Sequence, residues 1–196
     1  MSSKNDAIGV LALQGDFLEH QKALERIGRS SRQVRKASEL QGLRALVLPG
    51  GESTTMLKFL EEEDLVDPLR ELYAGGAAFF GTCAGAILLA VEVTSPRQAS
   101  LGLMDVTVER NGYGRQLDSH VAEEPCEDLA PDPLPMIFIR APVIRRCGRA
   151  VRVLARHRGE PVLVRQDRLL AATFHPELSD DARVHRYFVE IVAGIR

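Results

Sequence analysis

The first half of the chain alternates short apolar runs with segments of helical periodicity. The apolar runs cover residues 8–13, 45–48 and 77–80, and each ends in a turn that contains glycine. The segments between and after them (residues 17–27, a segment that begins at Ser53 as helix N-cap, residues 68–73 and residues 84–91) place apolar residues at helical spacing. Strands that alternate with helices form a parallel sheet with crossover helices. The pattern therefore predicts an open α/β fold.

The second half has a different pattern. Short strand candidates cover residues 103–108, 136–139, 151–155, 161–164 and 169–174, and a final amphipathic helix covers residues 182–195. The acidic, proline-rich segment 124–135 is the best candidate for an exposed loop. We find no internal repeat and no linker. A length of 196 residues suits one core, so we expect a single domain over residues 1–196.

Composition excludes several classes of partner. Lys and Arg number 25 against 27 Asp and Glu, so the net charge of −2 does not suggest nucleic acid or an anionic membrane. No apolar run is long enough to span a bilayer, and residues 1–6 lack the features of a secretory signal. Three widely spaced cysteines fit neither a disulfide framework nor a zinc site. We therefore expect a cytoplasmic protein.

The strongest local signal is Gly-Thr-Cys-Ala-Gly at residues 81–85, between an apolar strand and a helix. This is the pattern of a nucleophile elbow, with Cys83 in place of serine. The sharp turn exposes the nucleophile at the edge of the sheet, and the backbone N–H of Ala84 can face the same place as an oxyanion donor. A buried, unreactive cysteine is the alternative, but the strand–turn–helix context favours a nucleophile.

A thiolate that attacks an amide needs an acid to protonate the leaving amine, and histidine suits this role. His175 follows the strand candidate at residues 169–174 and precedes Pro176 and Glu177. The Glu177 carboxylate can accept a hydrogen bond from the imidazole and fix its tautomer. The other four histidines lack this setting, and we interpret each as a surface or satisfied structural residue; they are His20, His120, His157 and His185.

Pro-Gly-Gly-Glu-Ser at residues 49–53 follows another predicted parallel strand. It should therefore lie at the same sheet edge as Cys83, where ligands of open α/β sheets bind. The glycines permit close approach to the backbone, so the N–H of Gly51 is a candidate second oxyanion donor. Walker A and dinucleotide-binding fingerprints are absent from the sequence.

Together, Gly-Thr-Cys-Ala-Gly, Pro-Gly-Gly-Glu-Ser-Thr and Phe-His-Pro-Glu resemble the class I, triad-type glutamine amidotransferases. The resemblance is closer to one family, the glutaminase subunits of pyridoxal 5′-phosphate synthase. Its motifs occur in that family's order over almost the whole chain, at residues 11–15, 48–56, 80–85, 108–111, 114–116, 138–142 and 174–178.

The resemblance implies a flavodoxin-like, three-layer α/β sandwich with a mostly parallel central sheet and extra antiparallel strands in the C-terminal half. It implies a catalytic triad of Cys83, His175 and Glu177, with Gly51 and Ala84 at the oxyanion hole. The residues that it implies around L-glutamine are Gly50, Gly51, Glu52, Arg110, Ile139 and Arg140. An arginine is chemically suited to grip the α-carboxylate of glutamine with two hydrogen bonds.

The resemblance also implies hydrolysis of L-glutamine to glutamate and ammonia without a metal or organic cofactor. The ammonia would pass to a (β/α)₈-barrel synthase subunit that makes pyridoxal 5′-phosphate. It places Gln14 near the subunit interface as a possible switch. The chain departs from the family at Gly112, usually Ser or Ala, and at Tyr113, usually Phe. Gly112 could loosen the loop of Arg110.

Three alternatives remain at this stage. One is a glutaminase that feeds another synthase, such as imidazole glycerol phosphate synthase; the segments around Arg110 and Arg140 argue against it. Another is a cysteine hydrolase or stress protein on a related sandwich, which leaves Phe-His-Pro-Glu unexplained. The last is an inactive module that only binds a partner, which the intact Cys83, His175 and Glu177 disfavour. The sequence suggests no role for Cys126 or Cys147.

Overall fold

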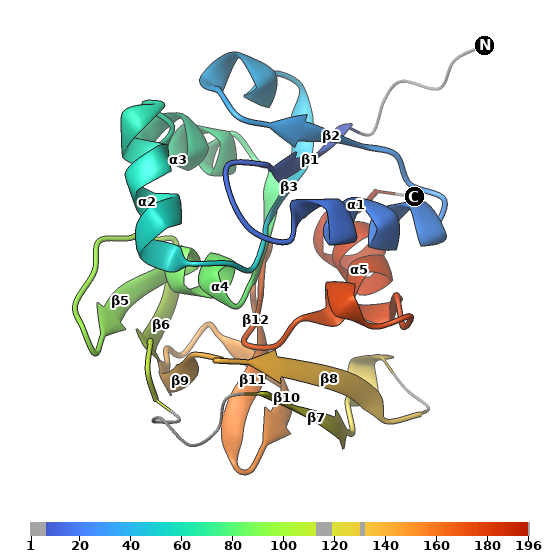
Figure 1. Ribbon diagram of the computed structural model, residues 1–196. Helices are drawn as coiled ribbons and strands as arrows, with labels where there is room; N and C mark the ends of the chain where they lie inside the picture. Colours follow the sequence, from blue (N-terminus) through green and yellow to red (C-terminus); the bar gives the residue numbers. More distant parts are fainter. Residues whose placement is uncertain (1–6, 113–118, 130–131, 196) are drawn as a thin grey trace.

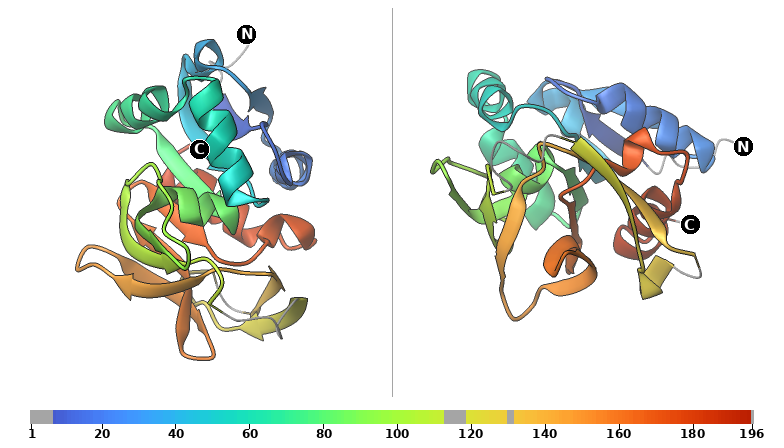
Figure 2. Two further views of the ribbon diagram at one scale, coloured as in Figure 1. Left: turned by 60° about the vertical axis from the view of Figure 1, so that its left-hand side comes forward. Right: turned by 60° about the horizontal axis from the view of Figure 1, so that its bottom comes forward.

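The computed structural model describes residues 7–112, 119–129 and 132–195. A central sheet lies between two layers of helices, and two small sheets extend from it at one end (Figures 1 and 2). In order across the central sheet, its strands are β10 (Arg152–His157), β11 (Glu160–Gln166), β12 (Leu169–Ala172), β4 (Ala78–Thr82), β3 (Leu43–Leu48), β1 (Ala7–Leu11) and β2 (Ser31–Val34). The strands from β12 to β2 are parallel, and β11 and β10 continue the sheet with antiparallel pairing.

The helices cover both faces of the central sheet. On one face lie α1 (Phe17–Arg26), α5 (Arg183–Tyr187) and the π-helical segment Phe188–Val192; on the other lie α2 (Ser53–Glu62), α3 (Val66–Ala74) and α4 (Ala84–Leu89). Successive side chains of a strand point to opposite faces. Phe79 and Phe80 therefore enter different cores: Phe79 joins Met56 and Leu60, whereas Phe80 joins Leu24 and Phe188.

The two small sheets place further segments beside the carboxyl edge of the central sheet. One contains β5 (Ala90–Thr94), β6 (Met104–Glu109) and β9 (Val143–Cys147). The other is the antiparallel pair of β7 (Ser119–Glu124) and β8 (Leu134–Ile139). Single 3₁₀ turns cover Ala37–Leu40, Glu127–Leu129 and Pro176–Leu178. Arg110 directly follows β6, and Arg140 directly follows β8, so both sheets end at the candidate site.

The predicted α/β fold, with mostly parallel strands and additional antiparallel ones, is confirmed. Four local predictions were wrong. The helix predicted over residues 84–91 ends at Leu89, and β5 begins at the next residue. Glu52 caps α2 and Ser53 is its first helical residue. Segment 124–135 contains ends of β7 and β8 and a 3₁₀ turn, and the helix predicted over residues 182–195 changes to a π-helix at Phe188. That residues 1–196 form one domain stays a prediction.

Among the described residues, no helix combines the length and apolar character needed to cross a membrane.

Candidate active site

The carboxyl ends of four neighbouring parallel strands converge on one place. The turn after β1 carries Gln14, the turn after β3 carries Gly50 and Gly51, Cys83 directly follows β4, and β12 leads into His175. Parallel strands present their carboxyl ends at a common edge, and this edge is where open α/β sheets bind ligands. The sheet order therefore brings together residues that are up to 161 positions apart in the chain.

Cys83 occupies a strained turn between β4 and α4. Its backbone has φ 47° and ψ −101°, a region that residues with a side chain rarely adopt. The Cys83 N–H donates to the Ala172 carbonyl on β12 at 2.8 Å, and its sulfur lies 4.0 Å from the carbonyl oxygen of Ile139. The residue is 7% exposed. These contacts hold the thiol at the sheet edge, as the elbow pattern predicts.

Glycines on both sides make this turn possible. A Cβ added to Gly81 would lie 2.5 Å from the backbone carbonyl of Gly85, and a Cβ on Gly85 would lie 2.0 Å from the carbonyl oxygen of Leu48. Both distances are shorter than any real Cβ contact. The two glycines therefore allow α4 to start directly against β3 and β4.

His175 and Glu177 form a buried hydrogen-bonded pair. His175 Nδ1 lies 2.8 Å from Glu177 Oε1, and both residues are almost fully buried. The backbone N–H of His175 donates to the Ile137 carbonyl on β8 at 2.8 Å, which fixes the imidazole's position. Burial alone would lower the pKa of His175, but hydrogen bonds to Cys83 and Glu177 raise it to about 10. The cysteine, histidine and glutamate predicted as a triad thus meet in space.

Asp16 is a second carboxylate beside the same imidazole. Its Oδ2 lies 3.5 Å from His175 Nδ1, and burial raises the pKa of Asp16. Ligand atoms of Asp16, His175 and Glu177 all lie within 4.8 Å of one another, which is close enough for a metal ion. However, a metal bound at His175 Nδ1 would replace its hydrogen bond to Glu177. The metal and the histidine–carboxylate pair therefore exclude each other at this nitrogen.

The glycine pair after β3 packs directly against the other site residues. A Cβ on Gly50 would lie 2.4 Å from His175 Cε1, and a Cβ on Gly51 would lie 2.4 Å from Gln14 Oε1. The Gln14 side chain accepts a hydrogen bond from the backbone N–H of Glu52 at 2.9 Å. The Gln14 amide therefore covers the Gly51–Glu52 turn, beside the proposed oxyanion donor.

These elements surround a pocket of about 390 Å³. It is lined by Gln14, Asp16, Gly51, Glu52, Ser53, Cys83, Ile87, Arg110, Asn111, Ile139, Arg140, His175 and Leu178. Eight of these thirteen are among the residues predicted from the sequence. Three other predicted residues do not line it: Glu177 lies behind His175, Gly50 packs on the His175 ring, and Ala84 is buried at the start of α4.

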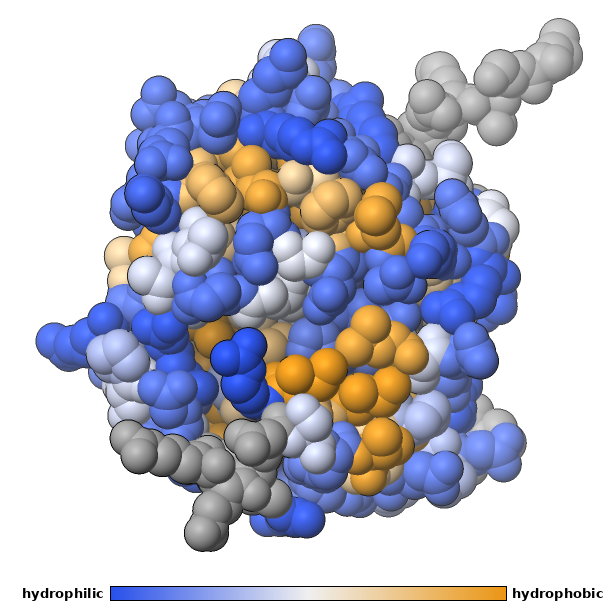
Figure 3. Space-filling view, in the orientation of Figure 1, coloured by the Kyte–Doolittle hydropathy of each residue, from blue (hydrophilic) through white to orange (hydrophobic). Residues whose placement is uncertain are grey.

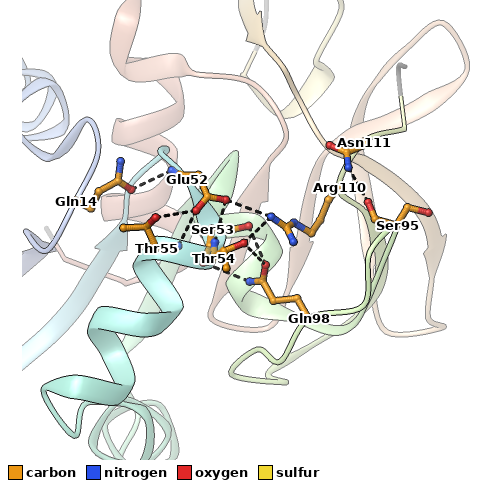
Figure 4. A network of polar contacts seen from close by, with 9 residues as sticks. All are labelled: Gln14, Glu52, Ser53, Thr54, Thr55, Ser95, Gln98, Arg110 and Asn111. Carbon is orange, nitrogen blue, oxygen red and sulfur yellow. Dashed lines mark hydrogen bonds and ion pairs between the residues drawn. The ribbon is translucent and has the colours of Figure 1, made fainter. Parts of the chain in front are cut away.

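A polar network forms one wall of the pocket (Figure 4). Glu52 accepts hydrogen bonds from the N–H groups of Thr54 at 3.1 Å and Thr55 at 2.7 Å, and so caps α2. Arg110 Nη2 donates to Glu52 Oε1 at 3.2 Å and to Thr54 Oγ1 at 2.8 Å. The Arg110 side chain is 16% exposed. These contacts hold a cation at the pocket with little freedom of movement.

Several site residues were not found by sequence reasoning. Asp16 and Leu178 lie within motif segments or next to them. Their residue types alone did not indicate a role in the site. Ser53, Ile87 and Asn111 also line the pocket. His20, interpreted as a structural histidine, is fully buried with its Nε2 3.5 Å from Glu177 Oε1. His20 comes close to Glu177 because α1 packs against the sheet, which the sequence does not indicate.

The histidine predictions are partly wrong. His20 pairs with His185 at 2.9 Å and His120 pairs with His157 at 3.0 Å, so these residues form one buried and one partly buried pair. One nitrogen of His120 and one of His185 are buried without a hydrogen-bond partner among the described residues, which contradicts the expectation that they are satisfied. Burial and the neighbouring His20 lower the pKa of His185 to about 3. All three cysteines are free thiols.

Of the two departures, Gly112 packs closely against β9. A Cβ there would lie 2.5 Å from Val143 Cγ2, so a larger residue requires Val143 to move. Tyr113 and the motif at residues 114–116 lie outside the described residues.

With this geometry in place, comparison with known proteins first defines the class. A solved structure described as a glutamine amidotransferase is 51% identical in sequence to this chain. The two superpose with a TM-score of 0.90, over 96% of this chain and 99% of that one. The fold is that of the glutamine amidotransferases.

The chain belongs to the SNO glutamine amidotransferase family, whose sequence model matches residues 10–194. Among its curated relatives is the pyridoxal 5′-phosphate synthase subunit PdxT of Solibacter usitatus, which is 55% identical over 93% of this chain and 97% of the relative. The protein of the same description from Thermus thermophilus is 53% identical, over 96% of this chain and 98% of the relative.

Proposed function

We propose that this chain is the glutaminase subunit of a pyridoxal 5′-phosphate synthase and hydrolyses L-glutamine to L-glutamate and ammonia. The family membership and the two PdxT relatives support the reaction and the pathway. The observation that carries the proposal is the pocket in which the elbow thiol of Cys83 faces the His175–Glu177 pair.

Glutamine would bind with its side-chain amide toward Cys83 and its α-carboxylate toward Arg110. A guanidinium grips a carboxylate with two parallel hydrogen bonds, and the Glu52–Thr54 contacts hold Arg110 in place for this. Glu52 in turn offers a carboxylate to the α-ammonium group of the substrate. The Ile139–Arg140 segment also lines the pocket.

The Cys83 thiolate attacks the side-chain carbonyl carbon of glutamine. The tetrahedral oxyanion is stabilised by the backbone N–H groups of Gly51 and Ala84. His175 gives its proton to the leaving nitrogen, ammonia departs, and a thioester on Cys83 remains. His175 then takes a proton from water, which attacks the thioester and releases glutamate. Glu177 fixes the imidazole and stabilises its cation.

The ammonia would be consumed by a (β/α)₈-barrel synthase subunit in a hetero-oligomeric complex. Free ammonia is protonated quickly in water, so direct transfer preserves the reactive form. Hydrophobic side chains gather near β7 and β8 on the face shown in Figure 3. Val121 on β7 and Leu178 at the pocket are among the exposed large hydrophobic residues. The partner would dock here, in the cytoplasm, where free thiols persist.

The contact of Gln14 with the Gly51–Glu52 turn fits a switch. Docking that moves Gln14 would reorient this turn and complete the oxyanion hole. We therefore expect low glutaminase activity from the isolated chain.

The test measures glutamate formed from glutamine by the purified chain, alone and with the barrel subunit of pyridoxal 5′-phosphate synthase. Strong activation by that subunit, and loss of activity in Cys83→Ala, would support the proposal. Activation by the barrel subunit of imidazole glycerol phosphate synthase instead would retain the glutaminase and reject the pathway. A Cys83→Ala protein that still hydrolyses glutamine would reject the mechanism.

A further inference from the structure

Behind the His175–Glu177 pair lies a second imidazole that the mechanism above does not use. His20, on α1, has its Nε2 3.0 Å from Thr82 Oγ1 and 3.5 Å from Glu177 Oε1. Thr82 Oγ1 itself lies 3.5 Å from the same carboxylate oxygen. On its other side, His20 Nδ1 lies 2.9 Å from His185 Nε2. All four side chains are buried, so no contact with bulk water competes with these bonds.

The hydrogen bonds determine which nitrogens carry protons. Burial holds the pKa of His185 near 3, so His185 is neutral and has one N–H group. Its Nδ1 is buried without a partner among the described residues. An N–H left unpaired in the interior costs more than an unpaired lone pair, which places the His185 proton on Nε2, where it can be donated to His20 Nδ1.

This assignment sets the direction of the whole chain of bonds. Because His20 Nδ1 accepts, the His20 proton lies on Nε2 and points to Thr82 Oγ1 and Glu177 Oε1. The Thr82 hydroxyl then donates to Glu177, and His175 Nδ1 donates to the same carboxylate. Donors run from His185 through His20 to Glu177 without a conflict.

A buried carboxylate needs these donors. Burial by itself raises the pKa of Glu177, but the hydrogen bonds donated by His175 and His20 lower it below its ordinary value. Glu177 Oε2 has no partner among the described residues, so every polar contact that keeps the carboxylate ionised converges on Oε1. Removal of one donor should therefore weaken the hydrogen bond between the Glu177 carboxylate and His175.

We propose that His20 is a positioning residue for the glutaminase reaction: its Nε2–H group, with the Thr82 hydroxyl, holds the ionised Glu177 carboxylate against His175, and His185 fixes the tautomer of His20. This inference rests on the proposed function and extends it, since it assigns two histidines and a threonine to support of the triad.

The experiment compares His20→Leu, which removes both ring nitrogens, with His20→Gln, whose amide NH₂ can replace the Nε2–H donor. The complex with the barrel subunit is assayed. We expect His20→Leu to lower kcat about 10- to 100-fold, the effect of one lost hydrogen bond to a charged group, with KM within about twofold. His20→Gln should recover most of the loss. The matched control is Gln21→Leu on the same helix, which removes side-chain hydrogen bonds to Ser31 and Gln33 outside the pocket lining and should leave kcat unchanged.

A double-mutant cycle separates positioning from a general packing role. If His20 acts through the Glu177 carboxylate, His20→Leu should cause little further loss in a Glu177→Gln background. Additive losses, or a Gln variant as slow as the Leu variant, would overturn the inference. Should His20→Leu fail to fold, the near-isosteric Thr82→Val replaces it in the same cycle, with the same criteria.

One readout does not depend on turnover. In His20→Leu the carboxylate should hold the protonated imidazole less firmly, so the NMR titration midpoint of His175 should fall. We expect a fall of about one pH unit, which corresponds to a tenfold weaker binding of the His175 proton. An inactive wild-type complex would reject the proposed function. The titration midpoint of His175 would still test whether His20 positions Glu177. An unchanged midpoint would reject the inference while leaving the glutaminase intact.

Discussion

Arg110 Nη2 lies 3.2 Å from Glu52 Oε1, although the two residues are 58 positions apart and follow strands of different sheets. The pair joins the end of β6 to the N-terminus of α2 across one wall of the pocket (Figure 4). It keeps the Arg110 guanidinium in place before substrate arrives. It also places a positive and a negative group beside the proposed site of the α-carboxylate and α-ammonium groups of glutamine.

The first prediction concerns Arg110→Lys. Lysine keeps the positive charge but cannot make two parallel hydrogen bonds to a carboxylate. We expect KM for glutamine to rise about 10- to 100-fold with kcat within about threefold, because binding of the α-carboxylate is shared by ground and transition states. Steady-state kinetics with the barrel subunit measure both constants. Arg152→Lys is the control, since Arg152 pairs with Asp128 away from the pocket; equal KM values for the two variants would remove Arg110 from the binding site.

The second prediction concerns the stability of α2. Glu52 caps this helix through the N–H groups of Thr54 and Thr55, so Glu52→Ala should lower the free energy of unfolding by about 1 kcal/mol. Glu62→Ala at the other end of the same helix removes only an exposed ion pair with Lys58 and should cost less than about 0.5 kcal/mol. Urea unfolding curves of the two variants give the comparison. Equal losses would show that Glu52 contributes only as a surface charge.

The sequence was sufficient to predict the parallel half of the fold because its signals are local. Apolar strands that end in glycine turns, at residues 48–51 and 80–85, predict both the strand and the edge at which it ends. β7 (Ser-His-Val-Ala-Glu-Glu) was missed because its pattern is polar and its stability comes from pairing with β8. β5 was missed because the apolar run continues from α4 without a break, so no change of period marks the boundary at Ala90.

The site followed the same rule. Cys83 directly follows β4 and His175 lies three residues after β12, so the sheet alone predicts that they meet. His20 and Asp16 reach the site from α1, and their positions depend on how that helix packs on the sheet. The spacing of residues in the sequence does not predict how this helix packs. The family resemblance supplied Arg110, Ile139 and Arg140, which the two small sheets bring to the pocket.

The third prediction is a pH dependence. The raised pKa of His175, about 10 against an ordinary 6.5, means that the folded protein binds this proton more tightly than the unfolded chain. The corresponding stability is fully present below pH 6.5 and is lost as the pH rises toward 10. In Glu177→Gln a hydrogen bond and a charge that raise this pKa are gone, so the loss between pH 6.5 and 10 should be smaller. Unfolding free energies across this range provide the test.

The same substitution should also affect catalysis. A glutamine at position 177 can present the wrong hydrogen-bonding group to His175 and favour the wrong tautomer, so we expect kcat to fall about 10²- to 10⁴-fold. Asp16→Asn is the matched control, because Asp16 contacts the same nitrogen at 3.5 Å rather than 2.8 Å from a partly exposed position. Its effect on kcat should be below about tenfold. The reverse order of effects would make Asp16 the carboxylate partner of His175.

The last prediction separates two costs of replacing glycine. Gly85→Ala should destabilise the protein by at least about 3 kcal/mol, because the new Cβ would lie 2.0 Å from the Leu48 carbonyl oxygen, in backbone that cannot move without separating α4 from β3. Gly28→Ala has open space around the new Cβ but a φ of +73°, so only backbone strain of about 1 kcal/mol applies. Urea unfolding measures both. The difference between the two variants isolates the steric requirement of the elbow, since the added methyl group is identical. If the Gly85→Ala loss did not exceed that of Gly28→Ala, close packing of α4 on β3 would not be what holds Cys83 in its strained conformation.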